Sequence, residues 1–422
     1  MVGSFAYHRS DSSMNTFARL LSFALILVAL TGCGDSDTSD ERAVRTVRFW
    51  QFWSDPAQRA ALDTLLREFE RTNDCTVEVT NLLWNDGKAK LQAAFNSGAP
   101  PDVIELGSDW IAQFSSAGVL LELPSDSAGI ARFVPYTLSP AMWNRKAYAY
   151  PWTIDTRVMF VNTELAARSG ASASVKTFSE LLTSARAVQR SGTAGIGMNG
   201  ADRHRLYKKI LPMLWTYGGD VFDANGQPAL NSSQNIAAVT MYADLARSGI
   251  VETQRQLDAM FLQGQTGFWN SGSWMLSKLA ATTKLRYAIV PMPGIDGRPG
   301  VSFAGGEYLA ISKKAGNRDL ARKLVAFLTH GEQSIRFCSQ VAEAGFPADK
   351  NFVSHESLTR DPLRAAFAQQ LQSARMTPVH PKWLDIEEVL EDAVVRVIYG
   401  ERSPKQALDE AQQEVRRIVN AP

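Results

Sequence analysis

The chain has 422 residues, with 44 Lys and Arg against 43 Asp and Glu, 45% hydrophobic residues, 3 Cys and 10 Trp. This length predicts two domains or lobes, because a single hydrophobic core stops growing near roughly 250–300 residues. The near-zero net charge argues against a nucleic-acid binder, and three cysteines are too few for a disulfide-built scaffold or a four-cysteine zinc site.

The first 32 residues resemble a lipoprotein signal peptide. Residues 20–30 (LLSFALILVAL) form an apolar stretch behind Arg19. It is too short for a bilayer span of about 20 residues but typical of a signal-peptide core. The stretch runs into LTGC, which resembles the lipobox of bacterial lipoproteins, where the cysteine (here Cys33) is acylated and becomes the mature N-terminus. Ordinary secretion with an incidental Cys33 is the alternative, and Met14 is a second candidate start.

Residues 33–43 are polar and predict a flexible tether. Removal of residues 1–32, which carry Arg9, Arg19 and Asp11, leaves 42 basic and 42 acidic residues, so the mature chain is neutral. Two further cysteines remain, Cys75 and Cys338. Pairing and two free buried thiols are both open on this pattern.

The first part of the mature chain alternates between strand and helix patterns. Residues 44–52 alternate as a strand, and Ser54-Asp55-Pro56 begins an amphipathic helix over 56–72. A strand over 75–83, a helix over 86–97 and a short buried strand in PPDVIEL follow. This order predicts an α/β lobe with a largely parallel sheet.

The later segments keep the mixed pattern and become mostly helical. Strands are predicted at 147–150 and 158–161, which flank Pro151, and at 285–290 and 308–312. Glycine-rich loops are predicted at 192–200, 218–219 and 304–306. Helices are predicted at 177–190, 203–217, 232–248, 274–280, 318–329, 332–343, 362–373, 384–398 and 404–419.

The sequence gives little support for the common catalytic and nucleotide-binding motifs. Residues 195–200 (GIGMNG) match G-x-G-x-x-G literally, but they lie in mid-chain before a charged segment, outside the early βαβ unit that a dinucleotide site needs. The histidines outside the leader show no metal-ligand spacing and are interpreted as isolated surface or capping residues. No G-x-S-x-G or phosphate-loop motif is present. A distant pair of carboxylates for glycoside hydrolysis stays open.

The tryptophans stand mostly at element ends with polar neighbours, as in FWQFWSD, LLWND, GSDW, PWTIDT and FWNSGSW. A flat ring suits the C–H face of a sugar, while nearby carboxylates and amides bind the hydroxyl rim. For a single Trp, ordinary packing is an equal alternative. Together these pairings predict sugar binding.

Several segments resemble the family 1 extracellular solute-binding proteins of ABC importers, the group that contains maltose- and trehalose/maltose-binding proteins. PPDVIELGSDWIAQFSSAGVLLEL is similar to the family's "PDV…D…A..G.L..L" segment, and YAYPWTIDTRVMFVNTELAARSG resembles "Y.lP...dt..l.YN.dL...aG". VKTFSELL, YGGDVFDANGQPALNSSQNIAAVTMYADL, GQTGFWNSGSWMLSKL, FAGGEYLAISKKAGNRDLARKLVAFLTHGEQ and IYGERSPKQALDEAQQEV continue the order. The resemblance covers nearly the whole mature chain.

The resemblance implies an α/β fold of the two-lobed periplasmic-binding-protein-like type (class II), with the ligand cleft between the lobes. By analogy, lobe 1 comprises 44–150 plus 285–312 and lobe 2 comprises 151–284 plus 313–422. Cys75 and Cys338 then lie in different lobes, which argues against a bridge between them.

The resemblance also implies site residues. Trp53, Ser54 and Asp55 occupy the first strand-to-helix loop, and Asp109 matches a carboxylate that binds sugar hydroxyls in relatives. Leu106 stands where maltose binders tend to have an aromatic residue. The remaining implied ligand contacts are Trp152, Asp155, Gly272, Trp274, Gly305, Gly306, Glu307 and Trp383.

The resemblance therefore implies a lipid-anchored, exported solute-binding subunit that captures a di- or oligosaccharide by cleft closure and delivers it to ABC permease subunits. We expect a monomer with no catalysis, no metal, no cofactor and no nucleic-acid partner. The alternatives are another solute in the same fold, such as a polyol or glycerol phosphate, and a secreted glycoside hydrolase. The motif loops are acidic and aromatic, which favours a neutral sugar over a phosphate.

Overall fold

An eleven-stranded mixed β-sheet runs through the described part of the chain, with strand order β2-β1-β3-β11-β6-β9-β7-β8. The computed structural model describes residues 45–125, 127–282 and 284–421. The predicted signal peptide, the acylated Cys33 and the 33–43 tether lie outside these residues. Strands β10 and β12 add to β6, and β13 adds to β11.

The first three strands form the parallel unit that the sequence predicts. Strand β1 (Arg45–Gln51) pairs in parallel with β2 (Cys75–Asn81) and β3 (Val103–Gly107). Helix α1 (Pro56–Asn73) begins with proline at its first position and buries Leu62, Leu65, Leu66 and Phe69. Helix α2 (Gly87–Asn96) leads into β3. Because the strands are parallel, their carboxyl ends meet at one edge of the sheet.

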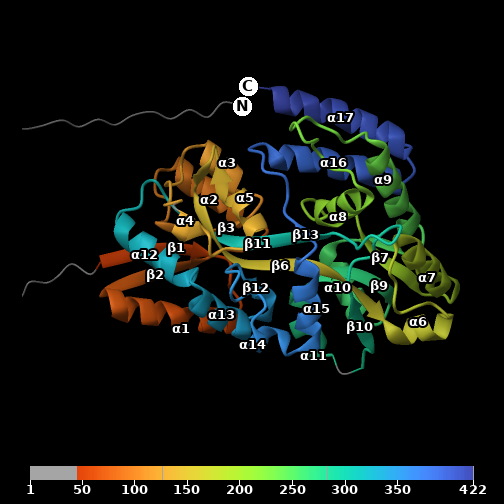
Figure 1. The fold of residues 1–422 in the computed structure, drawn as a ribbon, viewed down its shortest axis with the longest axis horizontal. Coiled ribbons are helices and arrows are strands. Elements are labelled where there is room, and N and C mark those ends of the chain that lie inside the picture. The colour runs from red at the N-terminus through yellow and green to blue at the C-terminus, as the bar shows by residue number, and fades with distance from the viewer. Residues whose placement is uncertain (1–44, 126, 283, 422) are drawn as a thin grey trace, which may run out of the picture. The chain divides into compact units, whose positions relative to one another are not determined.

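Two long strands connect the two ends of the sheet. Strand β6 (Ala149–Asn162) and strand β11 (Ser302–Ile311) pair antiparallel to one another, and Figure 1 shows them passing between two groups of helices. The sequence predicts two short strands around Pro151, whereas β6 is continuous. The ladder accommodates the proline with a register shift: Glu307 pairs with Thr153 and Tyr308 with Pro151, so Trp152 is an extra residue.

The predicted glycine-rich loop at 304–306 is wrong, because these residues lie inside β11. The glycines serve close packing rather than a turn. A Cβ at Gly306 would lie 2.5 Å from the Thr153 carbonyl oxygen, and one at Gly305 would lie 2.9 Å from Asp155 Oδ1.

The other end of the sheet contains β9 (Thr266–Gly272), β7 (Ala194–Asn199) and β8 (Ile250–Glu252), which are again parallel. The predicted loop at 192–200 is therefore also wrong over β7. A Cβ at Gly195 would lie 2.1 Å from the Ala185 carbonyl oxygen, so glycine lets helix α7 (Phe178–Arg190) approach the strand. This packing explains the G-x-G-x-x-G pattern without a nucleotide.

The remaining helices mostly agree with the predicted ranges. Helices α12 (Arg318–Leu328) and α13 (Gly331–Gln340) contact α1, on the β1 side of the sheet. Strand β10 (Tyr287–Val290) pairs with the far end of β6. The other elements are α3 (Ile111–Ser116), α4 (Ser127–Ile130), a 3₁₀ turn (Pro135–Thr137), α5 (Leu138–Ala141), β4 (Met142–Trp143), β5 (Lys146–Ala147), α6 (Thr163–Ser169), α8 (Tyr207–Tyr217), α9 (Ser233–Ala246), α10 (Gln254–Leu262), α11 (Trp274–Ala280), a 3₁₀ turn (Ala342–Ala344), β12 (Phe346–Pro347), α14 (Glu356–Thr359), α15 (Pro362–Leu371), β13 (Ala374–Arg375), α16 (Trp383–Ile398) and α17 (Pro404–Asn420).

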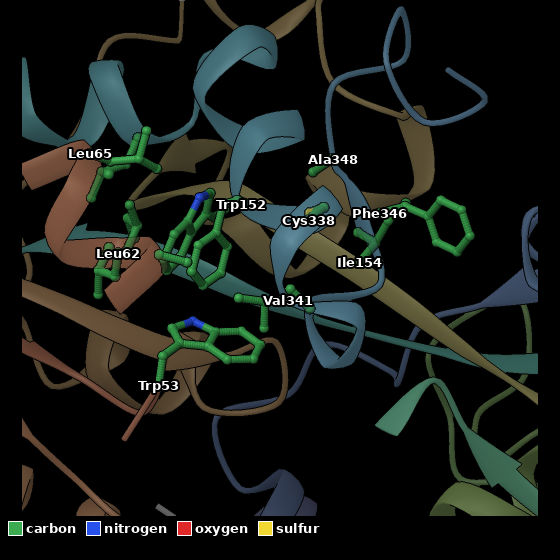
Figure 2. Packing of buried hydrophobic residues seen from close by; sticks show 14 of the residues in the cluster. Trp53, Leu62, Leu65, Trp152, Ile154, Cys338, Val341, Phe346 and Ala348 are labelled. Atoms are coloured by element: carbon green, nitrogen blue, oxygen red, sulfur yellow. The ribbon is translucent and has the colours of Figure 1, made fainter. Parts of the chain in front are cut away.

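An aromatic cluster joins β6 to α1 and α13. Trp152 is fully buried and stacks on Phe337, with ring centroids 4.9 Å apart and planes 19° apart. Trp53 meets both rings edge-on, at 6.3 Å from Trp152 and 5.2 Å from Phe337. Figure 2 shows Trp53 and Trp152 among the side chains of α1 and α13. Trp152 is thus a packing residue of the core.

The two cysteines of the described chain are both free, which decides between the alternatives that the sequence leaves open. Cys338 is fully buried on α13, and burial raises the pKa of its thiol to about 12. Cys75 at the start of β2 is partly exposed, and burial also raises the pKa of its thiol.

Burial and a high thiol pKa should make Cys338 inert in the folded protein, since the thiolate is the reactive form. We expect Ellman's reagent to modify a 34–422 protein slowly at Cys75 and to reach Cys338 only after denaturation. A Cys75→Ser variant isolates the Cys338 signal. Rapid modification of native Cys75→Ser protein would contradict the burial of Cys338.

Candidate functional site

A cavity of about 560 Å³ opens where the carboxyl ends of parallel strands face one another. The segments that follow β1 and β3 line one side of this cavity. The segments that follow β7, β8 and β9 line the opposite side. The middle of β6 and of β11 forms the part between them. Nine of the predicted site residues line this cavity: Trp53, Ser54, Asp55, Asp109, Asp155, Trp274, Gly305, Gly306 and Glu307.

Three of the predicted site residues do not line the cavity. Trp152 belongs to the buried aromatic cluster, and Trp383 is 1% exposed, with its ring 5.9 Å from that of Tyr207. Gly272 lies behind Trp274, where a Cβ would be 2.1 Å from the Trp274 ring. Gly272 therefore makes room for the Trp274 side chain.

The most exposed aromatic side chain of the cavity wall is Trp84, which the site prediction did not include. It is 40% exposed and stacks on Phe52, with ring centroids 4.2 Å apart and planes 20° apart. The polar neighbours of Trp84 in LLWND are typical of a sugar-binding tryptophan. No motif of the resemblance covers that segment, so Trp84 is absent from the implied contacts. Phe52 supports one face of Trp84, so this ring is held in place beside the cavity.

Trp274 is less available than the sequence suggests. The Arg157 guanidinium lies 4.5 Å from the centre of its ring, and Gly272 packs close to the same ring. The Trp274 Nε1–H donates to Asp258 Oδ2 at 2.9 Å. A ligand therefore meets Trp274 together with Arg157 rather than as an open ring.

Asp258 of α10 is hydrogen-bonded to five side chains in this part of the cavity wall, and it is not among the predicted site residues. The carboxylate is 4% exposed. It accepts hydrogen bonds from Trp269, Ser271, Gln254, Trp274 and Lys278 at 2.9–3.1 Å. A buried carboxylate needs such a complete set of donors. No local spacing in the sequence signals this set, because its members come from three elements.

Asp109 is held in one orientation before any ligand arrives. Its Oδ2 accepts a hydrogen bond of 3.0 Å from the Tyr207 hydroxyl of α8. Its Oδ1 lies where a Cβ at Gly107 would be only 2.8 Å away, so glycine leaves the space for the carboxylate. This bond also connects the two sides of the cavity.

Two carboxyl groups, Glu105 and Glu307, lie on the paired strands β3 and β11. Glu105 of β3 is fully buried and accepts a hydrogen bond of 2.8 Å from the Phe52 backbone N–H. Burial raises the pKa of Glu105 to about 8. Burial, together with the nearby Glu105 and Asp155 carboxylates, raises the pKa of Glu307 well above its usual range. Burial therefore favours the protonated form of both groups.

Beside the cavity, His204 pairs with Glu387 of α16, with 2.6 Å between Nδ1 and Oε1. Burial raises the pKa of Glu387 to about 7, and the hydrogen bond to Glu387 raises the pKa of His204. His204 is thus not an isolated surface residue. His330 and His355, by contrast, cap α13 and α14, as the sequence analysis expects.

The cavity wall also carries basic residues that the sequence analysis did not place there: Arg157, Arg205, Lys208, Lys209, Arg255 and Lys278. The expectation of an acidic and aromatic cleft is therefore incomplete. Some of these side chains lie outside the segments that resemble the family motifs. The others lie at positions within those segments where the motif specifies no residue type.

The described residues contain no group of three or more His, Cys, Asp and Glu side chains placed to hold a metal ion. Among the same residues, no helix is long and apolar enough to cross a membrane.

Comparison with known proteins identifies the family. The galactooligosaccharide-binding protein of Bacillus subtilis is 23% identical over 416 residues, which cover 94% of this chain and 96% of that protein. The GacH receptor of Streptomyces glaucescens, solved unliganded and with acarbose, superposes with a TM-score of 0.78 at 22% identity and covers 89% of this chain and 98% of its own. UgpB of Mycobacterium tuberculosis, solved with glycerophosphocholine, gives a TM-score of 0.76 at 21% identity over 89% and 98% of the two chains.

These superpositions confirm the predicted α/β class and the two-lobed binding-protein fold. The relatives are named as binding proteins or receptors rather than enzymes. Residues 53–333, more than half of the 422, match the family model described as bacterial extracellular solute-binding protein. The chain therefore belongs to the bacterial extracellular solute-binding proteins.

Proposed function

We propose that this chain is the sugar-capturing subunit of an ABC importer, anchored outside the cytoplasm by a lipid on Cys33. One observation carries the ligand class: a cavity of about 560 Å³ has an exposed Trp84 beside fixed polar side chains such as Asp109. A ring binds the C–H face of a sugar, and oriented carboxylates accept hydrogen bonds from its hydroxyls. The volume suits a di- or oligosaccharide.

The proposed contact set retains Trp53, Ser54, Asp55, Asp109, Asp155, Trp274, Gly305, Gly306 and Glu307, and adds Trp84. All of these residues line the cavity. Trp152 and Trp383 are left out because they are buried away from it. Gly272 acts through the position of Trp274.

The mechanism that we propose is closure of two lobes over the ligand. Contacts support a division in which α12 and α13 belong with lobe 1, because both contact α1, and β10 belongs with lobe 2, because it pairs with the end of β6. The division by analogy instead assigns residues 285–301 to lobe 1 and residues 313–340 to lobe 2. A ligand that contacts both walls favours the closed state, which permease subunits would recognise.

The lipid anchor rests on the LTGC sequence at Cys33, and export rests also on the extracellular family. The anchor would hold a monomer near the permease at the membrane surface. Galactooligosaccharide is the ligand named for one relative and acarbose for another, and these names support a saccharide for this chain.

The test is a thermal-shift and calorimetric screen of a 34–422 protein with mono-, di- and oligosaccharides. We expect one-to-one binding with a dissociation constant near micromolar, which corresponds to about 8 kcal/mol. Failure of every saccharide to bind would overturn the sugar assignment. Sustained release of hydrolysis products would instead favour an enzyme.

A further inference from the structure

Three basic side chains of the cavity wall are left for a ligand. Arg205 lies two residues before α8, Lys208 lies in its first turn, and Arg255 lies in the first turn of α10. Within the described residues, none of these three side chains makes a hydrogen bond or an ion pair. The other basic residues of the wall are engaged: Arg157 with Asp155, Lys278 with Asp258, and Lys209 with the Asn270 carbonyl oxygen.

Among the described residues, no carboxyl group of the cavity wall forms an ion pair with these three cations. Asp109 lies near Lys208, but its Oδ2 accepts a hydrogen bond from the Tyr207 hydroxyl. Asp258 is saturated by five donors, and Asp155 pairs with Arg157. Asp202 accepts hydrogen bonds from the Asn199 side chain and the Gln254 backbone. Burial and its acidic neighbours raise the pKa of Glu307, which favours its neutral form. Arg205, Lys208 and Arg255 are therefore cations of the cavity wall that have no ion-paired carboxylate among the described residues.

Lys208 lies over two aromatic rings. Its Nζ lies 5.3 Å from the centre of the Tyr207 ring and 5.7 Å from that of Phe303. Burial lowers the pKa of its ammonium, while the nearby Asp109 raises it. An ammonium partly removed from water without a hydrogen-bonded anion is destabilised. A negatively charged ligand group in the cavity would relieve this cost.

The backbone at the start of α8 does not offer a competing anion site. Glu391 of α16 already accepts hydrogen bonds from the N–H groups of His204 and Tyr207, at 2.8 and 2.9 Å. Beside α8, an anion would therefore be held by side chains rather than by these two N–H groups. Arg205 offers a planar, multiple donor and Lys208 a point charge.

We propose that the cavity binds a saccharide that carries an anionic group, with Lys208 and Arg205 holding that group and Arg255 contributing at the rim. This inference rests on the proposed sugar-binding function and narrows it to acidic sugars. Carboxylate and phosphate share the chemistry that these side chains recognise, so a uronic-acid sugar and a sugar phosphate are the two sources to distinguish.

The experiment measures binding by calorimetry to three probes: galactobiose, digalacturonate and galactose 1-phosphate. We expect digalacturonate or galactose 1-phosphate to bind at least tenfold more tightly than galactobiose, and the tighter of the two identifies the source. Its affinity should fall with added salt, because screening weakens ion pairing.

Variants then test the assigned residues. Lys208→Met should weaken the anionic probe at least tenfold and change galactobiose affinity less than threefold, and Lys323→Met on the exposed face of α12 should change neither. Arg205→Gln serves as the second variant if Lys208→Met does not fold by circular dichroism. The inference would be overturned if galactobiose bound as tightly as the anionic probes or more tightly. It would also be overturned if Lys208→Met weakened galactobiose and the anionic probe equally. Both outcomes would leave the proposed sugar binding intact. No binding of these probes, with no saccharide found in the wider screen, would overturn the proposed function itself.

Discussion

The Trp84→Ala substitution is expected to weaken sugar binding by about tenfold or more, which corresponds to about 1.4 kcal/mol or more. Trp84 is the cavity's most exposed aromatic ring, and Phe52 fixes its orientation by stacking. Loss of the ring removes both the buried area and the aromatic contact with the sugar face. Calorimetry with the best ligand from the saccharide screen measures the effect.

Two further variants make this result specific. Tyr399→Ala removes an aromatic side chain that is 59% exposed and lies outside the cavity, so ligand affinity should stay unchanged. Trp274→Ala should cost less than Trp84→Ala, because Arg157 and Gly272 already cover the Trp274 ring. An unchanged dissociation constant for Trp84→Ala would remove that residue from the site.

The Glu105→Gln substitution is expected to make the protein lose less stability than the wild type as the pH rises from about 4.5 to about 8. The native state holds the Glu105 proton more tightly than the unfolded chain does, with a pKa of about 8 against an ordinary value of 4.5. The unfolded chain therefore releases this proton first, and stability falls as the pH rises from about 4.5 to about 8. A tenfold difference in proton affinity corresponds to about 1.4 kcal/mol.

Denaturant unfolding at several pH values measures this contribution. Glutamine keeps an oxygen that accepts the Phe52 N–H, and it cannot ionise. The variant should show a shallower decline of stability above pH 5, with the remaining slope due to Glu307 and Glu387, whose pKa values are also raised. Glu78→Gln, on the exposed face of β2, is the matched control and should leave the slope unchanged. Parallel curves for wild type and Glu105→Gln would contradict a protonated Glu105.

Local pattern was sufficient for most helices. The predicted helix at 56–72 is α1, and those at 274–280 and 404–419 match α11 and α17 within one residue. Apolar spacing indicates these helices, and a capping box with proline at the first position marks the starts of α1 and α17. Helix α10 (QRQLDAMFL) is absent from the predicted helices, and yet it carries Asp258.

Strands with glycine were not predictable from local pattern. In β7 and in the middle of β11 the glycines allow close contact with Ala185 and Thr153, respectively, which are distant in sequence. The same limit applies to the site. Motif similarity placed Asp109 and Glu307 at the cavity, whereas Trp84, Lys208 and Asp258 reach it only through tertiary packing.

The fixed carboxylate of Asp109 has a consequence for stereochemistry. The Tyr207 hydroxyl donates to Asp109 Oδ2, and Asp109 Oδ1 occupies the space that a side chain at Gly107 would fill. The directions in which this carboxylate accepts hydrogen bonds are therefore set without ligand. Little rotational entropy remains to be lost on binding, and the carboxylate has little freedom to follow a displaced hydroxyl. An axial and an equatorial hydroxyl on the same ring carbon present their hydrogens in different directions. Under the proposed sugar-binding function, Asp109 is therefore a residue through which this protein would tell two epimers apart.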